Sequence, residues 1–237
     1  MRRVHCRLRG NKIDTANTGD LCRLKGKMNM ATKEELAQLS LCVYDVKGLA
    51  INRPALPSSD WEELEYHPDD RTGFSYGVFK NTRNTTTGEV VIAYTGSNEK
   101  LVVDFFGTNI PAGVGWTSLQ VKSAALAYQQ ALQKYGSDAS GSNITFTGHS
   151  LGGGLASVMA VWFNRPATTF DKAPFQLTAS SDEQLTNTKA YLAGKGFVNA
   201  VMDNAVTDFT SRESRVIHYY TQGNRGQIPI IMMQNRT

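Results

Sequence analysis

The pentapeptide Gly-His-Ser-Leu-Gly at residues 148–152 is the feature that most constrains how this chain can fold. It follows a run of β-branched and aromatic residues at 144–147 and precedes small residues at 153–157. In a G-x-S-x-G turn between a strand and a helix, the backbone is so crowded that glycines must flank the central residue, whose side chain then projects to solvent. The sequence therefore predicts an exposed Ser150 between a strand and a helix.

The residues after the pentapeptide support the helix, because apolar side chains recur there at helical spacing: Leu155, Val158, Met159 and Trp162. A plain Gly/Ser loop is the alternative interpretation. A phosphate-binding loop is disfavoured, since no Lys-Ser/Thr pair follows the glycines. A serine nucleophile on a strand-turn-helix unit is the favoured hypothesis.

Residues 148–156 resemble the nucleophile elbow of the class 3 (fungal-type) lipases, an α/β-hydrolase family whose elbow reads G-H-S-L-G-G-x-L-A. Residues 90–97 resemble the family's strand ending in Arg-Gly-Ser/Thr, although Thr95 stands in place of the arginine. Gly115-Trp116 is similar to the family's Gly-Phe before its next helix. The resemblance spans about residues 74–223. Antibacterial phospholipase toxins of bacteria look similar as well.

The resemblance implies Ser150 as the nucleophile, with the backbone N–H groups of Leu151 and Ser97 forming the oxyanion hole. Attack of a serine oxygen on an ester carbonyl creates an oxyanion, and each donor already aimed at it is worth ~3 kcal/mol. The N–H of Leu151 would also lie at a helix N-terminus, where the helix dipole favours negative charge. For Ser97, an ordinary turn at a strand end is the alternative interpretation.

The catalytic base is harder to assign, because the superfamily order is serine, acid, histidine. The chain has four histidines, and only His218 follows Ser150. His218 lies in an expected strand at 215–222. At the rise per residue of an extended strand, it is roughly 15 Å from the strand's end, where a catalytic loop would begin. This placement favours a half-buried strand histidine, with the catalytic base as the alternative.

The acid is equally uncertain from the sequence. The family places it after the strand that contains His218, but residues 223–237 include no Asp or Glu. Asn224 stands there, and loss of the triad carboxylate can cost ~10⁴ in turnover. Asp171 is the second candidate for the acid, with a surface turn residue as its alternative. Asp203 and Asp208 rank lower. One expectation is a chain that stops before its final strand and histidine loop.

Strands alternate with helices along the chain, which predicts an α/β fold of the α/β-hydrolase type. The sheet should be mainly parallel with helices on both faces, with or without its C-terminal strand and loop. The expected elements are helices at 32–46, 118–135, 151–163 and 183–208, strands at 74–81, 89–95, 144–147, 167–170 and 215–222, and a loop at 54–70. The apolar segment 101–107 is expected to be a lid or, alternatively, part of the core.

Charge is distributed unevenly along the chain. Residues 1–29 contain eight Lys/Arg and two Asp/Glu, a net of +6, so the formal charge of +4 leaves −2 for residues 30–237. The first segment is predicted to be a disordered basic tail and the second an α/β-hydrolase domain. No apolar core of a signal peptide follows the basic start, and no apolar run is long enough for a transmembrane span. We therefore expect a soluble protein that is either cytoplasmic or exported without a signal peptide. Cys6, Cys22 and Cys42 show no metal-ligand spacing.

These patterns predict a serine hydrolase that cleaves carboxylic esters of lipids, a triacylglycerol lipase or phospholipase, through an acyl-enzyme on Ser150. No cofactor, metal or nucleic acid is expected; the expected partner is a lipid or ester substrate, met in one hypothesis at a lipid–water interface. Two alternatives remain open. One is an esterase for non-lipid acyl groups such as plant phenolic esters, and the other is a catalytically impaired lipase fold that binds lipid.

Overall fold

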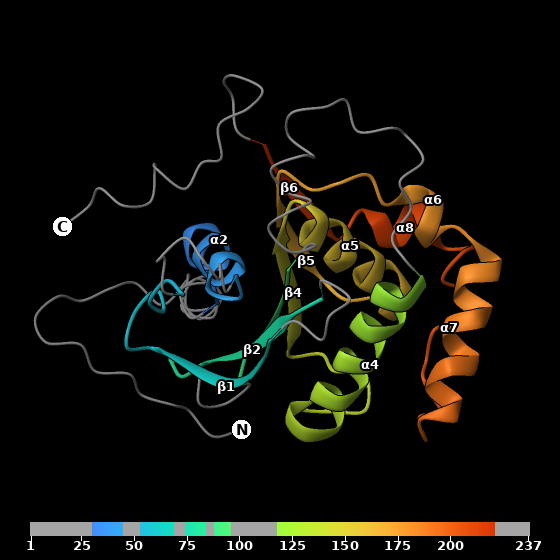
Figure 1. The fold of residues 1–237 in the computed structure, drawn as a ribbon, viewed down its shortest axis with the longest axis horizontal. Helices are drawn as coiled ribbons and strands as arrows, with labels where there is room; N and C mark the ends of the chain where they lie inside the picture. The colour runs from blue at the N-terminus through green and yellow to red at the C-terminus, as the bar shows by residue number, and fades with distance from the viewer. Residues whose placement is uncertain (1–29, 45–52, 69–73, 84–87, 96–117, 221–237) are drawn as a thin grey trace, which may run out of the picture. The chain divides into compact units, whose positions relative to one another are not determined.

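The computed structural model describes residues 30–44, 53–68, 74–83, 88–95 and 118–220. Its elements belong to one compact unit, Ala31–Thr237. In chain order they are α2 (Lys33–Cys42), β1 (Trp61–His67), β2 (Tyr76–Asn81), β3 (Val90–Tyr94), α4 (Ser118–Tyr135), β4 (Ile144–His149), α5 (Leu151–Phe163), β5 (Ala167–Phe170), α6 (Gln176–Ala179), α7 (Asp182–Gly194), α8 (Phe209–Glu213) and β6 (Val216–Tyr219) (Figure 1).

The described strands form a single six-stranded sheet in the order β1-β2-β3-β4-β5-β6. β1, β2 and β3 pair antiparallel, whereas β3 to β6 run parallel to one another. The two central pairings bring Tyr94 opposite Gly148 and His149 opposite Phe170. The carboxyl ends of β3, β4 and β5 therefore meet at one edge of the sheet, where ligand sites of α/β folds are usually built.

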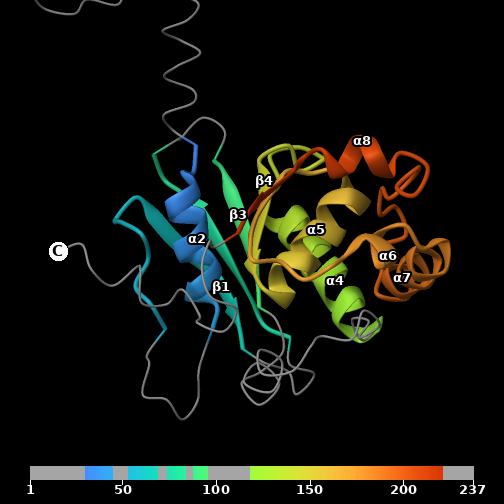
Figure 2. The same ribbon diagram turned by 90° about the horizontal axis from the view of Figure 1, so that it is seen from above.

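Helices cover both faces of this sheet. α2 lies on one face, and α4 and α5 pack on the other, with α6, α7 and α8 on that same side (Figures 1 and 2). Side chains alternate accordingly, because successive residues of a strand point to opposite faces. In β3, Ile92 and Tyr94 join the core under α4 and α5, and Val91 and Ala93 join the core under α2. The predicted α/β fold with a mainly parallel sheet is confirmed.

α5 is the most buried helix of the described chain. Every residue from Gly152 to Phe163 is buried, and the indole of Trp162 donates a hydrogen bond to the carbonyl of Ala179 at 3.0 Å. A helix that is apolar on all sides must be enclosed on all sides. β4, β5, α4, α6 and α8 provide that enclosure, so the first turn of α5 is held by several neighbouring elements at once.

Several elements differ from those expected from sequence; α2, for example, ends at Cys42 rather than at residue 46. β1 lies inside the expected loop 54–70; it is an edge strand, largely exposed, with a register shift between Glu63 and Glu65, so it lacks a buried alternating pattern. α6 is a short helix between the expected strand 167–170 and the expected helix 183–208, where no helix was predicted. The helical stretch 183–208 ends as α7 at Gly194, because turns follow. The last strand is shorter than 215–222.

Some expectations fall on residues outside the described part of the chain: the tail 1–29, the lid 101–107, and the residues Ser97, Gly115-Trp116 and Asn224. Within the described part, no helix combines the length and the apolar character needed to cross a membrane. The same residues contain no group of three His, Cys, Asp or Glu side chains suited to a metal ion. Cys42 is buried with a free thiol, and burial raises its pKa to about 11.

Candidate active site

Ser150 lies between β4 and α5 in a backbone conformation that few residues adopt. Its φ is 54° and its ψ is −123°, and it is the N-cap of α5 without a capping hydrogen bond from its side chain. A non-glycine residue in such a region costs about 1–3 kcal/mol, which the surrounding structure must offset. Ser150 is therefore a strained residue at a sharp turn between a strand and a helix.

The flanking glycines are required by the space around them. A Cβ on Gly148 would lie 2.4 Å from the carbonyl carbon of Gly152, and a Cβ on Gly152 would lie 2.0 Å from the carbonyl oxygen of Tyr94. Both contacts are with backbone atoms, which cannot rotate out of the way. The strand before the turn and the helix after it therefore approach each other more closely than any larger residue would allow.

The same contact brings the start of α5 against the end of β3. Gly152 packs on Tyr94 and Thr95. Thr95 is buried, and its backbone N–H and its hydroxyl both donate hydrogen bonds to the carbonyl of Ser75, at 3.0 and 2.9 Å. Thr95 thus replaces the expected arginine with a buried hydroxyl. Leu151 is the first residue of α5 and directly precedes Gly152, the residue that contacts the end of β3.

Two backbone–backbone hydrogen bonds and one from a side chain hold the turn on its other sides. The N–H of Ser150 donates to the carbonyl of Phe170 at 3.0 Å, and the carbonyl of Ser150 accepts from the N–H of Ala173 at 2.9 Å. The hydroxyl of Tyr44, at the end of α2, donates to the carbonyl of His149 at 3.1 Å. Two segments distant in sequence, residues 170–173 and Tyr44, therefore position the turn.

His149 precedes Ser150 but lies on the α2 face of the sheet. Its ring stands edge-on to the ring of Tyr44 at 6.4 Å between centroids. Burial lowers the pKa of His149, and the carboxylate of Asp171 partly opposes this shift. The ring is therefore neutral at pH 7 and packed between α2 and β4.

His218 lies on the opposite face, near the carboxyl end of β6. The described strand ends at Tyr219, so His218 is closer to the strand's end than the sequence suggested. It pairs in register with Thr169, which pairs with Gly148, two residues before Ser150. Its Nδ1 is 3.0 Å from the hydroxyl of Thr169. Burial, and then the positive charge of Lys172, lower the pKa of His218 to about 4.

Asp171 follows β5 in a left-handed turn with φ 44°. Its N–H donates to the carbonyl of Tyr219 at 2.9 Å, and its carboxylate acts electrostatically on His149. Asp203 forms an ion pair with Lys189 at 3.1 Å, and Asp208 forms one with Arg212 at 3.5 Å. Both ion pairs lie on the helical side of the molecule. In the described part of the chain, no hydrogen bond joins the Ser150 hydroxyl to an imidazole.

Sequence reasoning did not single out Tyr44, Thr169 or Lys172. Lys172 follows Asp171 and packs on the first turn of α5: a Cβ on Gly153 would lie 2.9 Å from the Cβ of Lys172. No short motif marks these residues, because their roles depend on contacts between distant segments.

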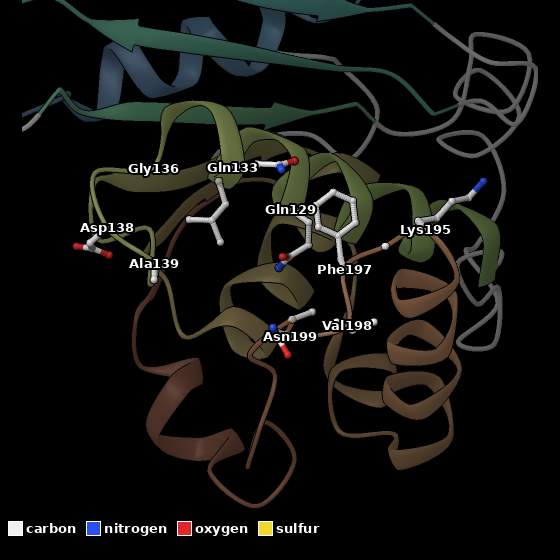
Figure 3. Close-up of a pocket in the computed structure, with 12 residues that line it drawn as sticks. Gln129, Gln133, Gly136, Asp138, Ala139, Lys195, Phe197, Val198 and Asn199 are labelled. Carbon is white, nitrogen blue, oxygen red and sulfur yellow. The ribbon is translucent and has the colours of Figure 1, made fainter.

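A pocket of about 530 Å³ lies elsewhere on the molecule, between the end of α4 and the loop after α7 (Figure 3). Gln129 and Phe197 are among the residues that line it, and Lys195 and Asp138 are seen toward opposite sides of the view in Figure 3. The end of α4 leads into the start of β4, so this pocket is at the opposite end of that strand from Ser150. It is not part of the candidate active site.

Comparison with known proteins agrees with this geometry. The family described as "Phospholipase-like: Tle-like phospholipase domain" matches residues 35–222, most of the chain. The chain belongs to this family. The match includes every strand of the described sheet and the turn at Ser150.

Two individual proteins are similar to this Tle-like phospholipase domain. The extracellular phospholipase A1 of Serratia liquefaciens is 29% identical over 155 residues, which are 63% of this chain and 44% of that protein. The chain therefore aligns with less than half the length of this curated relative. The crystal structure of M37 lipase is 13% identical, with 84% of this chain and 88% of that chain covered and a TM-score of 0.43.

Proposed function

We propose that this protein hydrolyses carboxylic esters of phospholipids, with Ser150 as the nucleophile. The observation that carries the proposal is the conformation of Ser150, a strained positive-φ residue at the start of a buried helix and at the carboxyl edge of the sheet. Membership of the Tle-like phospholipase family supports the substrate class. The relative from Serratia liquefaciens, a phospholipase A1 by its name, supports an acyl ester as the bond that is cleaved.

In the proposed mechanism, the Ser150 oxygen attacks the ester carbonyl carbon while its proton passes to a base. The carbonyl oxygen becomes an oxyanion that accepts a hydrogen bond from the N–H of Leu151 and, in the proposal, from the backbone of Ser97. The bond to the lysophospholipid oxygen then breaks, and that oxygen takes the proton. Water cleaves the acyl-enzyme to release a fatty acid and restore the serine hydroxyl.

The finer assignment to the class 3 lipase type, with segment 101–107 as a lid, is part of the same proposal. A lid-gated lipid hydrolase favours long acyl chains, whereas an esterase for phenolic or other small acyl groups does not. Rates measured on p-nitrophenyl esters of increasing chain length separate the two: a rise with chain length supports the lipid substrate, and a fall supports the non-lipid esterase.

The nucleophile is tested by covalent labelling with a fluorophosphonate probe. The wild-type protein should be labelled once, and Ser150→Ala should lose both labelling and ester hydrolysis. Ser181→Ala is a matched control, because Ser181 is also a helix N-cap but has an ordinary extended conformation, with φ −87° and ψ 112°. Labelling that persists in Ser150→Ala would place the nucleophile elsewhere.

A second candidate function is a lipase fold that binds phospholipid with little hydrolysis. The surroundings of His218 favour it, because a base with a pKa of about 4 accepts a proton poorly at neutral pH, and its Nδ1 already contacts Thr169. For this reason we expect His218→Gln to reduce labelling by less than about tenfold, well below the loss that removal of a triad histidine causes. A loss of about a thousandfold or more would instead assign His218 as the base.

A further inference from the structure

The backbone of Lys172 lies beside the turn that contains Ser150. The left-handed turn at Asp171 sends the chain from the end of β5 back over the first turn of α5. Lys172 then packs against Gly153, and the next residue, Ala173, donates its N–H to the carbonyl of Ser150 at 2.9 Å. The backbone position of Lys172 is therefore set by the same contacts that hold the turn at Ser150.

The ammonium group of Lys172 has no carboxylate partner in the described part of the chain. It stands over the ring of Phe175, with 4.5 Å between Nζ and the ring centroid, and Phe175 itself is buried. Glu213 acts on Lys172 only at longer range, and one of its oxygens accepts a hydrogen bond from Gln176 at 3.2 Å. Two further titratable side chains are close to Lys172 in sequence or in space: Asp171, whose carboxylate acts on His149, and His218, which is neutral at pH 7.

This environment is unfavourable for a cation that stays unpaired. Lys172 is half-buried, and burial lowers its pKa, while Glu213 partly opposes that shift. A lysine that serves only solubility would extend into water, where its charge is hydrated. A partly desolvated ammonium is stabilised strongly by an incoming anion, because the pair forms charge-assisted hydrogen bonds with little further loss of solvation.

We propose that the ammonium group of Lys172 binds the phosphodiester of a glycerophospholipid while the acyl ester of the same molecule reaches Ser150. Lysine is a common phosphate ligand because it offers a point charge with three donors. Lys172 would then select phospholipids over neutral glycerides. This inference rests on the proposed function, since it names the headgroup for the same site.

The test uses the full chain and two monomeric lipids with the same acyl groups, dihexanoylphosphatidylglycerol and dihexanoylglycerol. Binding is measured by titration calorimetry in the Ser150→Ala background, so the result does not depend on turnover. Lys172→Met should weaken binding of the phospholipid by about tenfold or more and leave binding of the glyceride unchanged. Lys172→Arg should retain most of the phospholipid affinity, because the charge is kept.

Lys195→Met is the matched control, since Lys195 also stands over an aromatic ring, that of Tyr191 at 5.7 Å, away from Ser150. It should change neither affinity. Inorganic phosphate is titrated in parallel and should bind far more weakly than the phospholipid; equal binding would assign the site to free phosphate and overturn the headgroup proposal.

Two further outcomes are distinguishable. If Lys172→Met weakens both lipids equally although its unfolding curve matches wild type, Lys172 has a role other than headgroup recognition and the inference fails. If wild-type protein binds the phospholipid through Lys172 but hydrolyses neither lipid, the proposed hydrolysis fails and the binding inference stands.

Discussion

Gly152 is the residue on which the geometry of the turn at Ser150 depends most directly. Its missing side chain lets the start of α5 rest on the carbonyl of Tyr94, and any Cβ there would lie 2.0 Å from that oxygen. The contact also determines how far the Leu151 N–H lies from the end of β3. Packing at this single position therefore connects fold stability with the proposed oxyanion hole.

We expect Gly152→Ala to destabilise the protein by about 2–3 kcal/mol or more, because the backbone of β3 or α5 must shift to admit the methyl group. Gly194→Ala is the control: Gly194 ends α7, a Cβ placed there would meet no atom within 4 Å, and the exchange should be neutral or stabilise by up to about 1 kcal/mol. Urea unfolding measures both changes. Equal stability of Gly152→Ala and wild type would contradict the close approach.

At the scale of elements, Glu65 connects the edge strand β1 to the end of α4. Its carboxylate accepts hydrogen bonds from the ammonium of Lys134 at 2.6 Å and the hydroxyl of Tyr135 at 2.7 Å, and its other oxygen lies 2.9 Å from Nε2 of His67. Burial raises the pKa of Glu65, but the hydrogen bonds from Lys134, His67 and Tyr135 outweigh it and lower the pKa to about 2.

Because the folded-state pKa is below the ordinary value of 4.5, Glu65 contributes stability above about pH 4.5 that is lost as the pH falls toward about 2. We expect Glu65→Gln to cost about 1 kcal/mol near pH 7 and progressively less as the pH approaches 2. Urea unfolding at several pH values measures the difference. Glu62→Gln, an exposed exchange on the same strand, is the control. A difference that stays constant with pH would rule out this linkage.

The strands differ in how well the sequence predicts them. β3, β4 and β5 were placed correctly because they are buried on both faces and rich in β-branched residues, a pattern that does not depend on distant partners. β1 was missed because Trp61 is its only buried residue and three of its residues are glutamates. Its pairing with β2, rather than its own pattern, makes it a strand.

The candidate site also contains parts that the sequence predicts and parts that it does not. The turn at Ser150 was predictable because steric exclusion by the backbone leaves glycine as the only choice at positions 148 and 152. The hydrogen bond from Tyr44 to His149 joins residues 105 positions apart, and the placement of Lys172 over Phe175 depends on a left-handed Asp171. Such contacts follow from tertiary packing, which no local pattern records.

At the scale of the whole molecule, charge is separated along the chain. Residues 1–29 have a net charge of +6, and residues 30–237 have a net charge of −2. The contacts that begin α2 start at Ala31, whose N–H donates to a carboxylate oxygen of Glu89 at 2.8 Å, and at Thr32, which forms a capping box with Glu35. The start of α2 is therefore held by residues that follow Met30.

We expect a protein consisting of residues 30–237 to unfold within about 0.5 kcal/mol of the full chain, because the core and the sheet are built from residues after Met30. The two proteins should differ in lipid binding instead. Basic residues near an anionic membrane contribute up to about 1 kcal/mol each at low salt, and this attraction is screened as salt increases. The full chain should therefore bind phosphatidylglycerol vesicles at low salt and be released at high salt, whereas residues 30–237 should bind weakly at both.

Vesicle co-sedimentation measures this difference, and a full-length variant with Lys12, Lys25 and Lys27 replaced by glutamine should bind to an intermediate extent. The vesicle experiment separates two uses of positive charge in one protein. Attraction by residues 1–29 depends on net charge and falls steeply with salt, whereas recognition by Lys172 involves one partly buried ammonium and should depend on salt only weakly. Strong, salt-insensitive vesicle binding by residues 30–237 would contradict this prediction. It would show that the folded domain binds the membrane without the basic segment.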